Sequence, residues 1–236
     1  MKRLFGTTLF ALLVTLTGCK KDETTVQRSL FTFEFTSSTE GWLGDFADYP
    51  NEQNVEAFYE LMFSHSVLPS PLNNNEGSLR QSGNNHSDDL FMFIKKKLDG
   101  LKPNTSYQVS LEVEIASNVA NGSIGVGGSP GEGVYIKAGA STIEPVKVLN
   151  SLENHYRMNI DKGNQSQAGK DMKLIGDFAN GTSLNIYKLK LLSTSSPIDV
   201  MTNANGEIWV IVGTDSGYEA TTTIYYDRIT VSIKEI

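Results

Sequence analysis

Short segments in which apolar and polar residues alternate dominate the chain. Phe31, Phe33 and Phe35 alternate with polar residues, and residues 107–115 alternate in the same way. Successive side chains of a β-strand point to opposite faces, so a period of two predicts strands with one buried face and one solvated face. The same reasoning predicts further strands at residues 57–64, 90–98, 134–138, 156–160, 184–192, 207–213 and 222–233.

Turn signals separate these segments. Asp99-Gly100, Asn121-Gly122, Asn180-Gly181 and Asn205-Gly206 are dipeptides typical of tight turns between strands. No amphipathic helical pattern follows the first twenty residues, and no repeat period is visible. The sequence therefore predicts an all-β fold, a single jelly-roll β-sandwich over residues 30–236.

The first residues have the pattern of a secretory signal. Lys2 and Arg3 precede an apolar run from Leu9 to Leu16, which is too short to cross the roughly 30 Å hydrocarbon core of a bilayer. The stretch Leu16-Thr17-Gly18-Cys19 resembles the lipobox of bacterial lipoproteins, and Cys19 is the only cysteine in the chain. The resemblance implies a signal peptide at residues 1–18, a lipid on Cys19 and a lipidated tether at residues 19–29.

The residues after Cys19 indicate to which membrane the lipoprotein would be sent. They are Lys20-Lys21-Asp22-Glu23, so the aspartate that retains lipoproteins at the inner membrane does not follow the cysteine directly. The acidic pair resembles signals that send some lipoproteins to the cell surface. We therefore expect a lipid-anchored protein of the outer membrane that faces outward.

The charge balance argues against nucleic acid as a partner. The chain has 20 basic and 27 acidic residues, and signal cleavage would also remove Lys2 and Arg3. Phosphate recognition normally requires clustered Lys and Arg. The one basic cluster, Lys95-Lys96-Lys97, lies in a predicted strand and is typical of a solvated sheet edge.

Three stretches resemble carbohydrate-binding modules built on the galactose-binding-like jelly roll, especially those that bind xylans and β-glucans. They are Phe33-Glu34 followed by Gly41-Trp42, residues 98–107 (LDGLKPNTSY) and residues 224–231 (IYYDRITV). Asn104 and Arg228 depart from the pattern, and residues 117–205 match no such module. Asp45-Phe46-Ala47-Asp48-Tyr49-Pro50 is similar to a stretch in a group of uncharacterised surface lipoproteins.

The resemblance implies a structural calcium ion. The glutamate of the opening strand and the first aspartate of the closing strand hold calcium in the resembling modules, and they correspond to Glu34 and Asp227. By alternation Asp227 would face inward with Ile229 and Val231, where a carboxylate needs a partner. A carboxylate at a strand end that accepts backbone hydrogen bonds is the alternative interpretation.

Glycan binding requires aromatic faces beside polar side chains. Two predicted loops offer that mixture, and the candidate ligand-binding residues are Trp42, Asp45, Asp48, Tyr49, Asn84, Asn85 and Asp88. The alternative is that Trp42 and Tyr49 pack inside the sandwich.

Catalysis has little support in the sequence. Gly127-Gly128-Ser129-Pro130-Gly131 fits the pattern around a hydrolase serine, but Pro130 lacks the N–H that such an oxyanion hole uses. The leading hypothesis is a surface-anchored, non-catalytic lipoprotein that binds polysaccharide. The alternatives are a structural or adhesive protein that binds protein or matrix, and, less favoured, a glycan hydrolase or lyase.

Overall fold

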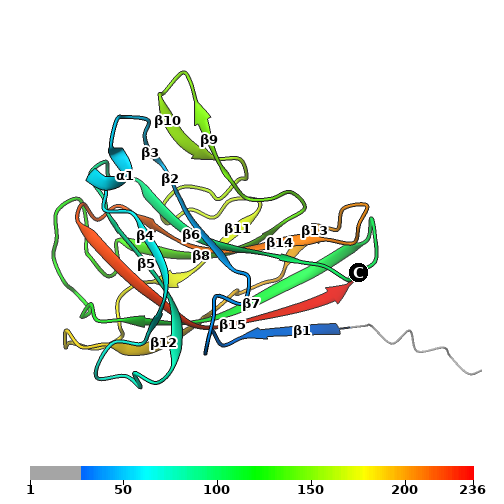
Figure 1. Ribbon diagram of the computed structural model, residues 1–236, viewed down its shortest axis with the longest axis horizontal. Helices are drawn as coiled ribbons and strands as arrows, with labels where there is room; N and C mark the ends of the chain where they lie inside the picture. Colours follow the sequence, from blue (N-terminus) through cyan, green and yellow to red (C-terminus); the bar gives the residue numbers. More distant parts are fainter. Residues whose placement is uncertain (1–27) are drawn as a thin grey trace, which may run out of the picture.

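The computed structural model describes residues 28–236 (Figure 1). Almost all of its regular structure is β, in two large antiparallel sheets and one small sheet. The predicted signal peptide and Cys19 lie outside the described residues. Among the described residues, no helix is both long and apolar enough to cross a membrane.

The first sheet has seven strands. Its path runs β12 (Lys188–Ser193), β7 (Ser106–Ser117), β15 (Thr221–Glu235), β5 (Gly77–Asn84) and β4 (Met62–Val67). Two further strands complete it: β1 (Arg28–Phe33) pairs with β15, and β13 (Ile198–Met201) pairs with β7. Strand β1 begins at Arg28, the first of the described residues.

The second sheet has five strands, in the order β11 (Met172–Asp177), β8 (Val134–Ser141), β14 (Ile208–Ser216), β6 (Leu90–Leu98) and β2 (Leu43–Ala47). A small third sheet joins β3 (Tyr49–Pro50), β10 (His155–Met158) and β9 (Lys147–Asn150). The only helix of the described residues is the single turn α1 (Val55–Phe58). In Figure 1 the β9–β10 hairpin rises at the top of the view, and β1 lies along the bottom.

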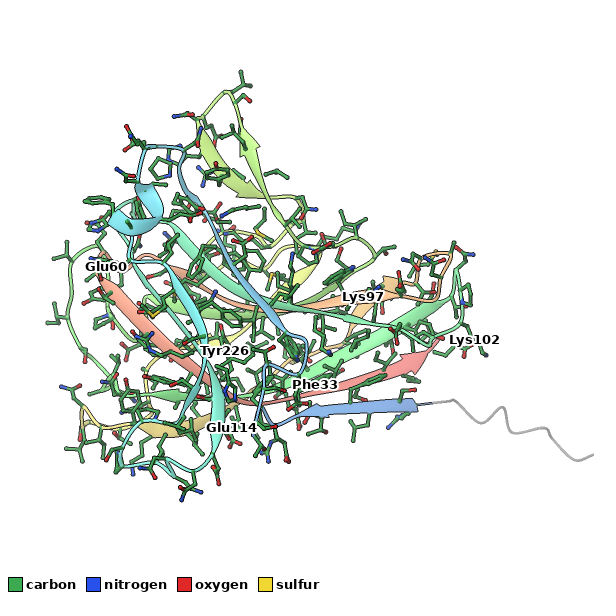
Figure 2. The ribbon with its side chains drawn as sticks, in the orientation of Figure 1. Phe33, Glu60, Lys97, Lys102, Glu114 and Tyr226 are labelled. Atoms are coloured by element: carbon green, nitrogen blue, oxygen red, sulfur yellow. The ribbon has the colours of Figure 1, made fainter. Side chains whose placement is uncertain are left out.

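The core fills the space between the two large sheets. Leu111, Val113 and Val231 from the first sheet pack with Val210 and Val212 from the second, and all are fully buried. Figure 2 labels two further members of this core, Phe33 and Tyr226. The prediction of an all-β jelly-roll sandwich is therefore confirmed.

The second sheet also buries its outer face. Phe91, Phe93 and Ile211 point away from the main core and form a second apolar cluster with Met172 and Ile160. Ile160 belongs to residues 159–171, which we call the strap. The backbone oxygen of Asp171 accepts a hydrogen bond from Ala140 on β8. The strap thus covers a face that alternation alone would leave to solvent.

Two local predictions differ from the structure. The strand predicted at 57–64 begins only at Met62, because Val55 and Tyr59 both turn inward four residues apart, as one helical turn requires. Strand β5 was not predicted, since Leu79 is its only large apolar residue. It nevertheless lies inside the first sheet, between β15 and β4, and its buried Gln81 amide donates to the backbone oxygens of Asp45 and Phe93.

Candidate functional site

Trp42 lies inside the sandwich. Its side chain has no exposed surface, and its ring meets the rings of Phe33 and Phe35 edge to face at centroid distances of 5.6 and 6.2 Å. The prediction that Trp42 offers a face to a sugar is therefore wrong. Packing against two phenylalanines removes more apolar surface from water than a position in the loop would.

Tyr49 is also fully buried, and its ring packs 5.2 Å from that of Tyr156. Its hydroxyl accepts a hydrogen bond from Lys147 Nζ at 2.7 Å, and burial raises the pKa of the phenol. The prediction of an exposed ligand-binding ring is wrong for Tyr49 as well. Both residues instead pack inside the sandwich, which was the alternative interpretation of the sequence.

The other predicted ligand residues separate into structural and surface groups. The Asn85 amide is buried and donates to the backbone oxygens of Ser216 and Tyr218, so it holds a loop rather than a ligand. Asp45 forms an ion pair with Lys147 at 3.3 Å. Asn84 is partly exposed at the end of β5, and Asp88 is exposed on the following loop.

Asp48 belongs to a cluster that the sequence did not reveal. We call it the ionic cluster, and its members are Asp48, Asp89, Lys137, Arg157, Lys162 and Asp215. The Lys162 ammonium lies 2.9 Å from Asp48 Oδ2 and 2.8 Å from Asp215 Oδ2. Arg157 Nη1 donates to Asp48 Oδ1 at 3.2 Å and to Asp89 Oδ2 at 2.9 Å.

Several elements bring the ionic cluster together on the outer face of the second sheet. Lys137 on β8 and Asp215 on β14 are fully buried there, with their amino and carboxylate groups 2.8 Å apart. Asp48 follows β2 with a left-handed backbone, at a φ of 61° that aspartate tolerates better than most residues. Asp89 precedes β6, Arg157 is in β10, and Lys162 is in the strap.

The three carboxylates of Asp48, Asp89 and Asp215 form the only trio of metal-ligand type whose atoms converge among residues 28–236, within 4.8 Å of one another. Three cationic side chains already balance their charge, and the Lys162 ammonium bridges two of them. We therefore assign no metal ion to this trio. Burial, followed by repulsion from Asp48, raises the pKa of Asp89 to about 6.

An open hollow of about 360 Å³ lies beside the ionic cluster. Polar side chains provide most of its lining, with Met158 and Ile160 as the apolar members. The full lining is Asp48, Asp89, Glu153, Arg157, Met158, Ile160, Asp161, Lys162, Gly163 and Asn164. Arg157 retains about a third of its side-chain surface while three acidic residues hold it in place. The hollow thus presents hydrogen-bonding groups whose positions are fixed by ion pairs.

A second hollow contains the predicted calcium ligands. Glu34 and Asp227 line it together with Thr36, Glu76 and Arg228, so the structure brings the two predicted residues to one place. Asp227 does not simply follow the alternation of β15. The register against β7 shifts between Tyr226 and Arg228, and this β-bulge leaves Asp227 partly exposed. Burial, followed by repulsion from Glu114 and Glu76, raises its pKa to about 6.

Sequence reasoning missed Asp89, Lys137, Arg157, Lys162 and Asp215 as site residues. Two of them carried a usable signal, because Lys137 and Asp215 interrupt otherwise apolar or small-residue strands. A charge within a buried strand indicates a partner of opposite sign. The sequence near each charge does not show which residue is its partner, because the six members of the ionic cluster span residues 48–215.

The comparisons with known proteins give low similarity. No family model matches the chain, and no curated protein matches its sequence. Among solved structures, a family 11 carbohydrate-binding module of the Clostridium thermocellum cellulase Lic26A-Cel5E aligns with 11% identity and a TM-score of 0.39, covering 86% of this chain and 94% of that one. A putative sugar-binding protein from Bacteroides thetaiotaomicron aligns with 8% identity and a TM-score of 0.40, covering 86% and 91%.

The alignments also include larger proteins. The enzymatically active domain of bacteriophage CBA120 tailspike protein 4 aligns with 8% identity and a TM-score of 0.32, covering 84% of this chain but only 20% of that one.

Proposed function

We propose that the protein is a surface-anchored lipoprotein that binds polysaccharide without cleaving it, in the hollow beside the ionic cluster. The observation that carries this proposal is the lining of the hollow. Arg157 and Asp89 are held 2.9 Å apart next to an open space, with Asp48 and Lys162 behind them. Groups fixed in advance lose little conformational freedom when a ligand binds.

The chemistry of the hollow suits sugar hydroxyls. Each hydroxyl can donate to a carboxylate such as Asp89 and accept from a guanidinium such as Arg157. Met158 and Ile160 supply apolar contact for the C–H groups of a ring. Acidic residues outnumber basic ones in the lining of the hollow, so an acidic polysaccharide would be repelled and a neutral one fits best.

Binding without cleavage is supported by the arrangement of the acids. Glycosidases separate a proton-donating carboxyl from a second carboxylate across the scissile bond. Here one guanidinium, that of Arg157, pairs with three of the four lining carboxylates, those of Asp48, Asp89 and Glu153. The fourth, that of Asp161, accepts backbone hydrogen bonds from Gly163 and Lys170, so none of the four is left free as a separate acid or nucleophile. Reducing ends released from a bound polysaccharide would instead favour a hydrolase.

The anchor is proposed from the sequence, with a lipid on Cys19 holding the protein in the outer membrane. The position of the hollow is compatible with this role. Arg157 and Met158 belong to β10, which rises at the top of Figure 1, whereas β1, the first described strand, lies along the bottom. A ligand in the hollow would then bind on the side away from the attachment.

We also propose that Glu34 and Asp227 bind a calcium ion. Carboxylate oxygens are the ligands that calcium prefers, and Glu76 and Thr36 line the same hollow. The one cation there, Arg228, is paired with Glu114 at 2.9 Å, so acidic groups outnumber it. Figure 2 labels Glu114, which lies on β7 beside the bulge of β15. A bound divalent cation would relieve the repulsion from Glu114 and Glu76 that, after burial, raises the pKa of Asp227.

An adhesive role is the second candidate, and one observation favours it. Ile124 and Val126 are 96% and 67% exposed, and Leu184 on a neighbouring loop is 58% exposed. The two loops are joined by a hydrogen bond from the backbone N–H of Asn121 to the oxygen of Thr182. Aliphatic side chains gathered at a surface are typical of protein contacts.

A glycan-array screen of the purified protein tests the proposed function. We expect binding to neutral polysaccharides and not to acidic ones, with signal lost in the Arg157→Ala variant. A folded protein that binds no glycan on the array, but retains a protein or matrix component in a pull-down, would favour the adhesive role instead.

A further inference from the structure

Lys137 and Asp215 are the most deeply buried oppositely charged pair of the described residues. Neither side chain has any exposed surface, and the Lys137 amino group lies 2.8 Å from Asp215 Oδ2. They extend from the paired strands β8 and β14, where Lys137 faces Gly213 and Asp215 faces Tyr135. Burying two ions is costly even when they are paired, so a neutral product of the same two groups would remove that cost.

The two oxygens of Asp215 have different surroundings. Oδ2 lies 2.8 Å from Lys162 Nζ and accepts from the backbone N–H of Gln165 at 2.9 Å. Oδ1 is buried and has no hydrogen-bond partner in the part of the chain that the structure describes. One oxygen is thus positioned to hold negative charge, whereas the other is free to leave.

A second carboxylate lies near that of Asp215. The carboxylates of Asp48, Asp89 and Asp215 each offer one oxygen within 4.8 Å of the others, and Asp89 Oδ1 is also buried without a hydrogen-bond partner among residues 28–236. Both oxygens of Asp48 are held in ion pairs, Oδ1 with Arg157 and Oδ2 with Lys162, whereas Asp89 is paired with Arg157 through Oδ2 alone. Asp89 is therefore the better proton carrier, because burial raises its pKa to about 6, so that its carboxylate can accept a proton and return it near neutral pH.

We propose that Lys137 and Asp215 are joined by an intramolecular isopeptide bond between Nζ and Cγ. The Lys137 ammonium gives one proton to Asp89, and the neutral amine attacks Asp215 Cγ. Negative charge that develops on Oδ2 is stabilised by Lys162 and the Gln165 N–H. Asp89 then returns its proton to Asp215 Oδ1, and the attacking nitrogen gives a second proton to the same oxygen. The bond between Cγ and Oδ1 breaks, and Oδ1 leaves as water. An ammonium and a carboxylate become an amide and water, with no oxidant or reductant.

Lys137, rather than Lys162, is assigned as the nucleophile, although both amino groups lie 2.8 Å from Asp215 Oδ2. Lys137 has no exposed surface, and burial lowers its pKa, which favours the neutral amine. Burial also disfavours the charged form of Lys162, but Asp215 and Asp48 outweigh it and raise that pKa. Lys162 therefore remains a cation that stabilises the reacting carboxylate.

Tryptic peptide mapping of the full-length protein by mass spectrometry tests the bond. Trypsin does not cut after a lysine whose amine is an amide, so residues 98–147 should be recovered joined to residues 191–228, with a mass lower than the sum by one water. Most of the 191–228 segment should occur in this joined form. Separate peptides 98–137 and 191–228 would overturn the proposal.

Two further results sharpen the test. Attachment of 191–228 to residues 158–170, with cleavage after Lys162 blocked, would show that Lys162 is the nucleophile and would overturn the assignment of Lys137. Asp89→Asn keeps the size of the side chain but cannot transfer the proton, so we expect a folded variant with separate peptides. A joined peptide at the wild-type level in Asp89→Asn would overturn the role given to Asp89.

Discussion

At the scale of single residues, an aromatic side chain can pack in the core or contact a ligand, and the residues around it in the fold determine which. Trp42 and Tyr49 follow the first strand in a loop rich in acids, which is the composition expected of a sugar site. Phe33 and Phe35 enclose Trp42, and Tyr156 packs against Tyr49. The sequence contains these aromatic residues, but only the fold shows that they pack around the rings of Trp42 and Tyr49.

Trp42→Ala should lower the free energy of unfolding by about 3–5 kcal/mol, because it leaves a cavity between the sheets. Chemical denaturation followed by tyrosine fluorescence measures the loss. A variant that unfolds at the wild-type denaturant concentration would contradict the burial of Trp42, and the exposed Phe58 provides a matched control whose replacement by alanine should cost much less.

Asp227 gives a prediction about pH in the presence of a chelator. Its pKa is about 6 in the folded protein, above the ordinary value of 3.8, so the folded state holds the proton more tightly than the unfolded chain. The free energy of unfolding should therefore fall as pH rises from about 4 to about 6. Asp227→Asn lacks this penalty, and we expect it to be more stable than wild type by about 1 kcal/mol at pH 7 and equal to it at pH 4.

Calcium should reverse that order at pH 7. A cation that binds only the folded state raises the melting temperature of the wild type by mass action, whereas Asp227→Asn has lost a ligand and should respond little. Melting curves of both proteins with chelator and with excess calcium measure the difference. Equal responses of the two proteins to calcium would remove the calcium proposal.

At the scale of elements, strands with a clear period of two were predictable and insertions between them were not. Strand β6 occupies residues 90–98 as predicted, since Leu90, Met92 and Ile94 all face the core. The strap has no such period. It lies on the second sheet through Ile160 and through charges on Lys162, and no local pattern specifies either contact.

The strap should depend on the absence of a side chain at Gly139. A Cβ atom there would lie 2.2 Å from the backbone oxygen of Asp171, so Gly139→Ala must push the end of the strap away from β8. We expect a loss of about 1–3 kcal/mol in stability and faster hydrogen exchange in residues 159–171. Gly128→Ala is the control, since its nearest neighbour would be 3.6 Å away. Unchanged exchange in Gly139→Ala would contradict the packing of the strap.

At the scale of the whole molecule, the proposed lipid anchor and the proposed binding hollow are both attached to one β-sandwich. The sandwich follows from the alternation of its strands, whereas the hollow does not. It needs Asp48 after β2, Asp89 before β6 and Arg157 in β10, three positions far apart in the sequence. The sequence predicted Asp48 as a ligand-binding residue beside Trp42 and Tyr49, whereas its neighbour in the hollow is the guanidinium of Arg157.

The anchor is tested by Cys19→Ser. The variant should leave the membrane fraction and fail to incorporate a fatty-acid probe, because serine cannot form the thioether that carries the lipid. Immunoblots of soluble and membrane fractions, with the wild type alongside, give the readout. Membrane retention of the variant at the wild-type level would refute the lipoprotein assignment.

The central claim is that the hollow beside the ionic cluster binds polysaccharide, and affinity electrophoresis in native gels tests it most directly. Gels that contain xylan or β-glucan should retard the wild type in at least one case. Arg157→Ala should weaken the binding about tenfold or more, because it removes charged hydrogen bonds to the ligand. Arg80→Ala, which removes an arginine from β5 in the other sheet, should migrate as the wild type does. Melting curves confirm that the variants are folded. A wild type that is retarded in no gel, or a folded Arg157→Ala that is retarded as strongly as the wild type, would contradict the account.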